Sequence, residues 1–151
     1  MKKVALLLLL ILAVFLYGCG GPPVGCGAIY AESPNSTYEG SFTGSYNSES
    51  GSGLDLELQL SIGTDGNLTG TVTESVSNRT ASASGKAFDF VNGCDKGTGI
   101  VVEFTFSGEE MRSLSGRRAQ SWAQPWKFNT TYSQGNVVGQ HGSGTVSLTR
   151  N

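Results

Sequence analysis

Residues 54–62 read Leu-Asp-Leu-Glu-Leu-Gln-Leu-Ser-Ile, the clearest strand signal in the chain. Apolar and polar side chains alternate at every position, which is the pattern of a strand with one face buried and the other in water. Residues 63–67, Gly-Thr-Asp-Gly-Asn, favour a tight hairpin because glycine and asparagine accept a positive φ angle. Leu68, Gly70 and Val72 then alternate with threonines, so the sequence predicts a return strand.

The same alternation recurs from residue 38 onward, and no segment there shows a helical period of useful length. Further strands are expected at residues 38–46, 84–91, 100–106, 111–116, 126–132 and 144–148. About eight short strands joined by turns are typical of a sandwich or a barrel. We therefore predict an all-β fold, a single antiparallel up-and-down β-barrel of about eight strands, with an open β-sandwich as the alternative.

Glycines fall on or near the predicted inward positions of several strands, namely Gly40, Gly44, Gly70, Gly85 and Gly144. A missing side chain allows strands to coil tightly at the corners of a barrel. A membrane-spanning barrel is not expected, because its strands need about 9–11 residues and most of those predicted here are shorter.

Residues 1–19 combine a basic start, an apolar run and a cysteine. Lys2 and Lys3 precede 13 uninterrupted apolar residues at 4–16, and Gly18 comes directly before Cys19. A helix over the apolar run would be about 20 Å long, too short to span a bilayer and typical of a secretory signal. An ordinary signal peptide or an uncleaved short anchor would account for the same pattern.

This arrangement resembles the signal of bacterial lipoproteins, in which the cysteine is acylated and becomes the first mature residue. The resemblance implies that residues 1–18 form a cleaved signal helix and that Cys19 carries fatty acids. Residues 19–37, rich in proline and glycine, are then a flexible lipidated tether, and residues 38–151 form the barrel domain. Gly20 after the cysteine, in place of aspartate, implies release to the outer membrane of the cell envelope.

The domain itself resembles two groups of proteins. It begins Tyr-Glu-Gly-Ser-Phe-Thr-Gly at residues 38–44 and ends Gly-Ser-Gly-Thr-Val-Ser-Leu-Thr-Arg at residues 142–150, as small Gly/Ser/Thr-rich bacterial lipoproteins of unknown function do. Residues 65–71, Asp-Gly-Asn-Leu-Thr-Gly-Thr, resemble a hairpin of the avidins, which share eight-stranded barrels with the lipocalins. The first strand carries Phe42 where those families have tryptophan, so the resemblance implies the architecture and not biotin binding.

The cysteines and the net charge narrow the function classes. Without Cys19, the remaining Cys26 and Cys94 are an even pair in an exported protein, so we predict a disulfide between them; two free thiols are the alternative. Two cysteines and the single His141 are too few ligands for a metal site. With a cut before Cys19, 8 basic residues would face 12 acidic ones, and no basic stripe predicts nucleic-acid binding.

No pattern in the chain predicts catalysis or a cofactor. His141 lies in a Gly/Ser-rich stretch expected to be a turn, and no nucleophile-elbow spacing of serine, histidine and acid is present. Glu74 shares its parity with Leu68 and Val72, so it either contacts a ligand inside the barrel or lies at the rim, where a carboxylate remains solvated. We expect a protein that is not an enzyme.

Two function classes remain. One is a lipid-anchored cell-envelope lipoprotein with a structural or protein-interaction role, using Arg117, Arg118 and Trp122 in a predicted loop at 117–125 to contact an envelope partner. The alternative is a barrel that binds a small apolar or amphipathic molecule. Its candidate lining consists of aromatic residues that could equally fill the core: Phe88, Phe90, Phe104, Phe106, Trp126, Phe128 and Tyr132.

Overall fold

The computed structural model describes residues 38–49, 54–92, 95–119, 124–135 and 141–151. The predicted signal and tether, with Cys19 and Cys26, lie outside these residues, as do Cys94 and Trp122. The lipid anchor and the disulfide therefore remain predictions.

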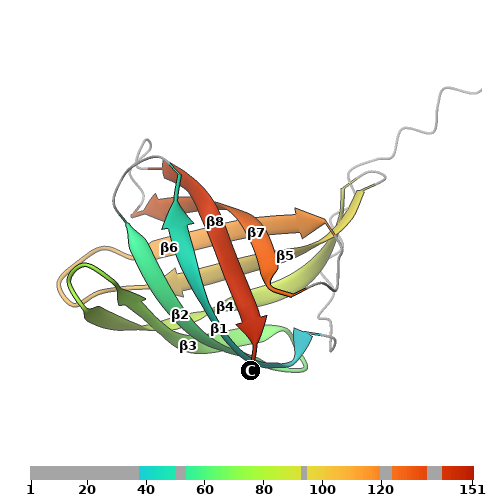
Figure 1. The fold of residues 1–151 in the computed structure, drawn as a ribbon, viewed down its shortest axis with the longest axis horizontal. Coiled ribbons are helices and arrows are strands. Elements are labelled where there is room, and N and C mark those ends of the chain that lie inside the picture. The colour runs from blue at the N-terminus through green and yellow to red at the C-terminus, as the bar shows by residue number, and fades with distance from the viewer. Residues whose placement is uncertain (1–37, 50–53, 93–94, 120–123, 136–140) are drawn as a thin grey trace, which may run out of the picture.

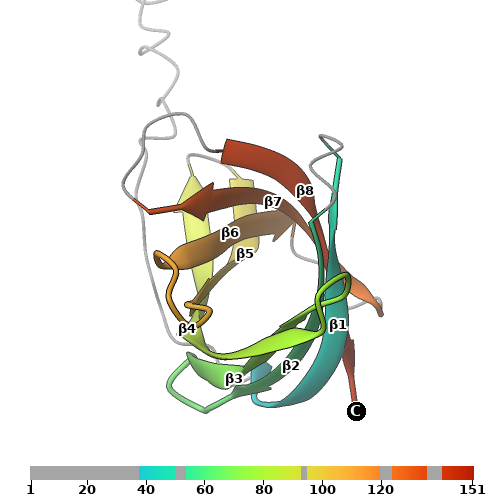
Figure 2. The same cartoon turned by 90° about the vertical axis from the view of Figure 1, so that its left-hand side faces the viewer.

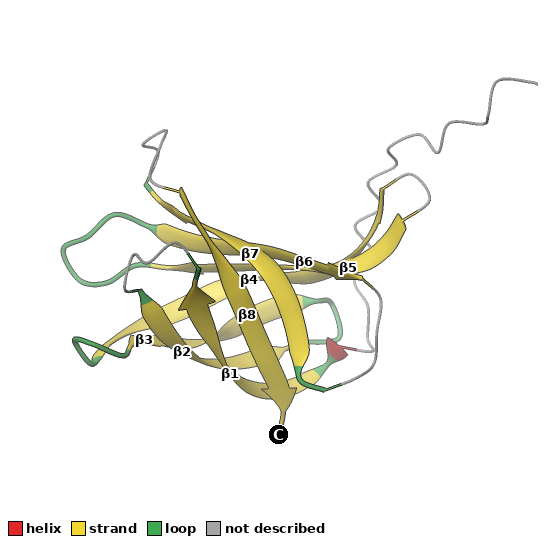
Figure 3. Cartoon of the chain, turned by 45° about the horizontal axis from the view of Figure 1, so that its top comes forward, coloured by secondary structure: helices red, strands yellow, loops and turns green. Residues whose placement is uncertain are grey.

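Eight strands form a closed antiparallel barrel in which each strand pairs with its neighbours in sequence and β1 pairs with β8 (Figures 1 and 2). This confirms the predicted up-and-down barrel over the sandwich. The strands are β1 (Gly40–Ser48), β2 (Asp55–Ile62), β3 (Asn67–Glu74), β4 (Arg79–Asn92), β5 (Asp95–Phe104), β6 (Arg112–Ala119), β7 (Trp126–Gln134) and β8 (His141–Arg150). Figure 3 shows that strand accounts for most of the described chain.

The alternation of β2 places its apolar residues inside the barrel. Leu56, Leu58 and Leu60 are at most 3% exposed, whereas the acidic and polar residues between them face water. The other strands contribute Phe42, Tyr46 and further apolar side chains to the same core. Burial of this apolar surface is the main source of stability, at about 25 cal/mol per Å².

The two ends of the barrel differ. The terminal end carries Tyr38, the turn at residues 63–66 and the C-terminal Asn151, whose amide donates to the carbonyl of Ser41. The opposite end, which we call the Phe106 end, faces the viewer in Figure 2. It carries the turn at 75–78 and the loop at 105–111.

The strands β4 and β5 extend beyond β3 as a hairpin arm at the terminal end, visible at the right of Figure 1. The pairing of β3 with β4 stops at Asn67 and Lys86, whereas β4 and β5 remain paired as far as Asn92 and Asp95. We define the hairpin arm as residues 87–92 and 95–100. Tyr38 contacts its inner side, where the Tyr38 hydroxyl donates to Asp89 Oδ1 at 2.9 Å.

The prediction of a loop over residues 117–125 is wrong at residues 117–119. Arg117 and Arg118 belong to β6, paired with β5 through Gly99 and Thr98. The inward positions of β6 are Arg112, Leu114, Gly116 and Arg118, all buried. Arg112 and Arg118, near the two ends of this strand, are buried but not apolar. They interrupt the apolar alternation from which strands are predicted.

Candidate interaction surface

The structure divides the seven aromatic residues that were predicted to line the interior. Phe104, Phe106, Trp126 and Phe128 lie inside the barrel and are at most 3% exposed. Tyr132 is half-buried and packs against this core, with its ring 6.3 Å from that of Tyr46. These five residues are core side chains, in keeping with the simpler of the two interpretations.

The prediction that Phe88 and Phe90 face the interior is wrong. The inward positions of β4 are the small residues Ala81, Ala83 and Ala87, so the two phenylalanines, at the opposite parity, lie outside. The large rings had suggested the buried face, but in this strand the buried side chains are alanines.

The two outer rings cover glycines of the neighbouring strand. Phe88 is paired with Gly99 and Phe90 with Gly97. A Cβ atom added at Gly99 would lie 2.3 Å from the Phe88 ring, and one added at Gly97 would lie 2.6 Å from the Phe90 ring. Each ring therefore lies flat against the glycine backbone, which leaves it half-buried with one face outward.

One basic side chain contacts these rings, and two others lie on the outer surface of the same part of the barrel. The Arg117 guanidinium lies 5.2 Å from the centre of the Phe90 ring, within the range of a cation–π contact. Lys86 precedes Phe88 by two positions on the same outer face, and it is exposed, as is Lys127 on β7. We call the outer side chains Lys86, Phe88, Phe90, Val101, Arg117 and Lys127 the basic aromatic face.

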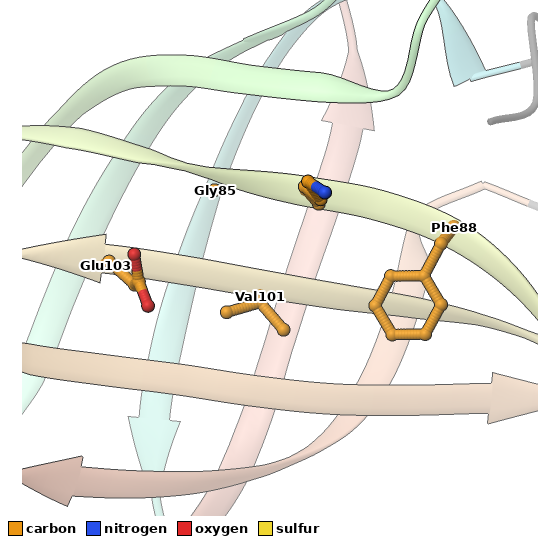
Figure 4. Close-up of a pocket in the computed structure, with 5 residues that line it drawn as sticks. Gly85, Phe88, Val101 and Glu103 are labelled. Carbon is orange, nitrogen blue, oxygen red and sulfur yellow. The ribbon is translucent and has the colours of Figure 1, made fainter. Parts of the chain in front are cut away.

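A surface pocket of about 380 Å³ opens beside this face (Figure 4). It is lined by Gly85, Lys86, Phe88, Val101 and Glu103. In Figure 4 the Phe88 ring extends from β4 over β5, next to Val101. The pocket combines an apolar floor with one cation and one carboxylate, which suits an amphipathic contact rather than a reaction.

Arg118, predicted at an interface, is buried inside the terminal end. Its guanidinium lies 5.3 Å from the Trp126 ring and 5.6 Å from the Phe128 ring. Burial lowers the pKa of Arg118, and the nearby Tyr38 acts in the opposite direction. Burial also disfavours the charged form of Tyr38, and so it raises the pKa of the Tyr38 hydroxyl, which also contacts Thr98. Of the two predicted interface residues that the structure describes, Arg117 alone therefore lies on the outer surface.

Four alternating charges form a closed ring at the Phe106 end. Glu74 pairs with Arg79 at 2.8 Å and with Arg112 at 3.5 Å, and Glu109 pairs with the same two arginines. The guanidiniums of Arg79 and Arg112 lie 4.7 and 5.1 Å from the centre of the Phe106 ring. We call these four residues the charge ring. Sequence reasoning missed it, because its members come from four segments that only the register brings together.

The charge ring shows where Glu74 lies, which its parity left open between the interior of the barrel and the rim. Its side chain is 15% exposed and lies at the end of the barrel, compensated by two arginines. Hydrogen bonds from Ser77 and then Arg79 lower its pKa, and a hydrogen bond from Arg79 lowers the pKa of Glu109. Both carboxylates are therefore held in the charged form, as structural partners of the arginines.

The lowered pKa values predict a loss of stability in acid. A carboxyl group whose pKa is lower in the folded state stabilises that state fully above its ordinary pKa, 4.5 for glutamate, and loses this contribution as the pH falls through the lowered value. The free energy of unfolding should decrease below about pH 4.5. In urea titrations, Glu74→Gln should flatten this decrease, whereas Glu57→Gln, at an exposed site on β2, should keep it. Equal pH profiles for Glu74→Gln and the unmodified chain would contradict the prediction.

Within the part of the chain that the structure describes, no cluster of three or more His, Cys, Asp or Glu could hold a metal ion. The same residues contain no helix long and apolar enough to cross a membrane. Comparisons with family models, with curated proteins and with solved structures found no match for this chain. The arguments on function therefore rest on its own residues.

Proposed function

We propose that this chain is a lipid-anchored lipoprotein of the cell envelope that is not an enzyme and has a structural or protein-interaction role. Cys19 would carry the fatty acids, and the outer membrane is the proposed location. The basic start, the short apolar run and the Gly-Cys pair at residues 18–19 support this proposal.

One observation on the domain supports a role through contact. The interior aromatic residues Phe104, Phe106 and Trp126 are packed away from solvent, whereas Phe88 and Phe90 present ring faces to the outside next to Arg117. Aromatic residues and arginine are enriched at interfaces and lysine is depleted there, so the rings and Arg117 are the residues expected at the centre of a contact. We therefore favour the outer surface over the interior as the functional part of the barrel.

The lipid anchor is tested by metabolic labelling of the full chain with a radioactive fatty acid. We expect label on the unmodified chain and on Cys26→Ser, and none on Cys19→Ser, which should also accumulate as the uncleaved precursor. Cys26→Ser is the matched control because it removes a nearby cysteine of the same export product. Label on Cys19→Ser, or its absence from the unmodified chain, would refute the proposal.

A further inference from the structure

We propose that the basic aromatic face docks on the anionic surface of the bilayer that holds the lipid anchor, and so fixes the orientation of the barrel. This inference rests on the proposed function, since it names the partner of the same surface. Four features of the chain carry it: the distribution of charge, the outer rings, the position of the hairpin arm and the length of the tether.

Charge is distributed unevenly around the barrel. Residues 38–78, which include β1 to β3, contain six acidic residues and no lysine or arginine. Residues 79–151, which include β4 to β8, contain eight basic and five acidic residues. Of these, Arg118 lies inside the barrel, and Arg79, Arg112 and Glu109 belong to the charge ring, which leaves five basic and four acidic residues. Because the barrel is closed, β1 to β3 lie across from β5 to β7 (Figure 2). An anionic surface would therefore repel one side of the molecule and attract the other.

The attractive side carries the basic aromatic face. Lys86, Arg117 and Lys127 are exposed there, and Glu103 is an exposed acid at its margin toward the Phe106 end. Each Lys or Arg held near an anionic bilayer favours association by roughly fivefold. A lipid headgroup layer offers many anions in a plane, which matches three cations spread over β4, β6 and β7.

The outer rings suit the boundary between headgroups and acyl chains. Phe88 and Phe90 lie flat on the glycine backbone and, with Val101, form a shallow apolar surface bordered by cations. Segments that lie on membranes combine an apolar surface with Lys and Arg in this way.

The hairpin arm carries the two rings of the basic aromatic face at the terminal end of the barrel, where the described chain begins at Tyr38. The inner side of the arm contacts Tyr38 through Asp89, and its outer side carries Phe88 and Phe90. The predicted tether of residues 19–37 has 19 residues and reaches at most about 65 Å. A tether of that reach leaves the orientation of the barrel open, while it keeps the bilayer at a high effective concentration.

Hydroxyl-radical footprinting of the processed, lipidated protein tests the inference. The protein is reconstituted in vesicles of phosphatidylcholine alone, or of phosphatidylcholine mixed with anionic phosphatidylglycerol. We expect oxidation of Phe88 and Phe90 to fall several-fold in the anionic vesicles and to recover in high salt, because salt screens exposed charges. Oxidation of Met111, which is exposed near the Phe106 end, should not change.

Two variants complete the test. The double change Lys86→Gln with Arg117→Gln should abolish most of the protection, since each cation accounts for roughly a fivefold effect. Glu57→Gln removes an exposed charge from the acidic side and should leave the protection in place. The fatty acids on the reconstituted protein are verified by mass spectrometry, so a missing anchor refutes the proposed function separately.

Two results would overturn the inference. One is a lipidated protein whose Phe88 and Phe90 are oxidised equally in both kinds of vesicle. The other is that Phe88 and Phe90 are protected from oxidation by an acidic envelope protein but not by anionic vesicles. That result would assign the basic aromatic face to a protein partner.

Discussion

Replacing Gly85 with alanine is expected to destabilise the barrel by about 3 kcal/mol or more, one of the largest effects of any single methyl group in this chain. Gly85 has a φ angle of +155°, which side-chain-bearing residues rarely adopt. A Cβ atom there would lie 1.9 Å from the carbonyl oxygen of Val101 and 2.8 Å from its carbonyl carbon. Both are backbone atoms of the paired strand β5, so they can move only if the pairing of β4 with β5 changes.

Gly108→Ala is the matched control, since Gly108 also has a positive φ angle, +80°, but no atom lies within 4 Å of its added Cβ. It should cost only about 1 kcal/mol, from the left-handed backbone alone. In thermal unfolding we expect Gly85→Ala to lower Tm by about 10 °C or more, and Gly108→Ala by about half of that or less. Similar losses for the two variants would show that the close approach of β5 does not matter.

The sequence predicted the barrel because its apolar alternation is strong in the strands where burial is greatest. Leu56, Leu58 and Leu60 gave both the period and the inward face of β2, and the structure confirms them. The close strand approach at Gly70 was also predictable, and a Cβ there would lie 2.0 Å from the carbonyl oxygen of Gln59. In these places the local pattern and the tertiary structure select the same residues.

The basic aromatic face could not be predicted from apolar alternation. In β4 the inward positions are alanines, whereas the large rings of Phe88 and Phe90 lie outside, where Gly97 and Gly99 leave room for them. A rule that assigns the larger apolar residues to the core therefore places the inner face of β4 outside and its outer face inside. Only the pairing of β4 with β5, which the sequence does not specify, shows that these rings have glycine neighbours.

The buried arginines were missed for a related reason. Arg112 and Arg118 occupy inward positions of β6, and isolated buried charges are costly, so such positions are usually apolar. Each is compensated by groups from distant segments: aromatic rings around Arg118, and Glu74 and Glu109 around Arg112. Compensation of this kind depends on three-dimensional proximity, and the only trace in the sequence is the shared parity of Arg112, Leu114 and Arg118.

Replacing Arg112 with alanine should destabilise the protein by about 3 kcal/mol, because it breaks the charge ring and leaves a gap beside Phe106. The Arg112 side chain is 9% exposed and pairs with both carboxylates of the ring. Its removal would leave Glu74 and Glu109 to share Arg79 alone, with an uncompensated negative charge at the Phe106 end. Arg117→Ala is the matched control on the same strand, and as an exposed residue it should cost less than about 1 kcal/mol.

A double substitution separates the charge from the packing. Arg112→Met keeps most of the aliphatic contact with Phe106, so its remaining cost should reflect the unpaired carboxylate. Adding Glu74→Gln restores neutrality, with Arg79 and Glu109 as the surviving pair, and should recover part of the lost stability in urea unfolding. Because the two residues interact directly, their effects should not be additive. Strict additivity would show that the contact between Arg112 and Glu74 contributes nothing to stability.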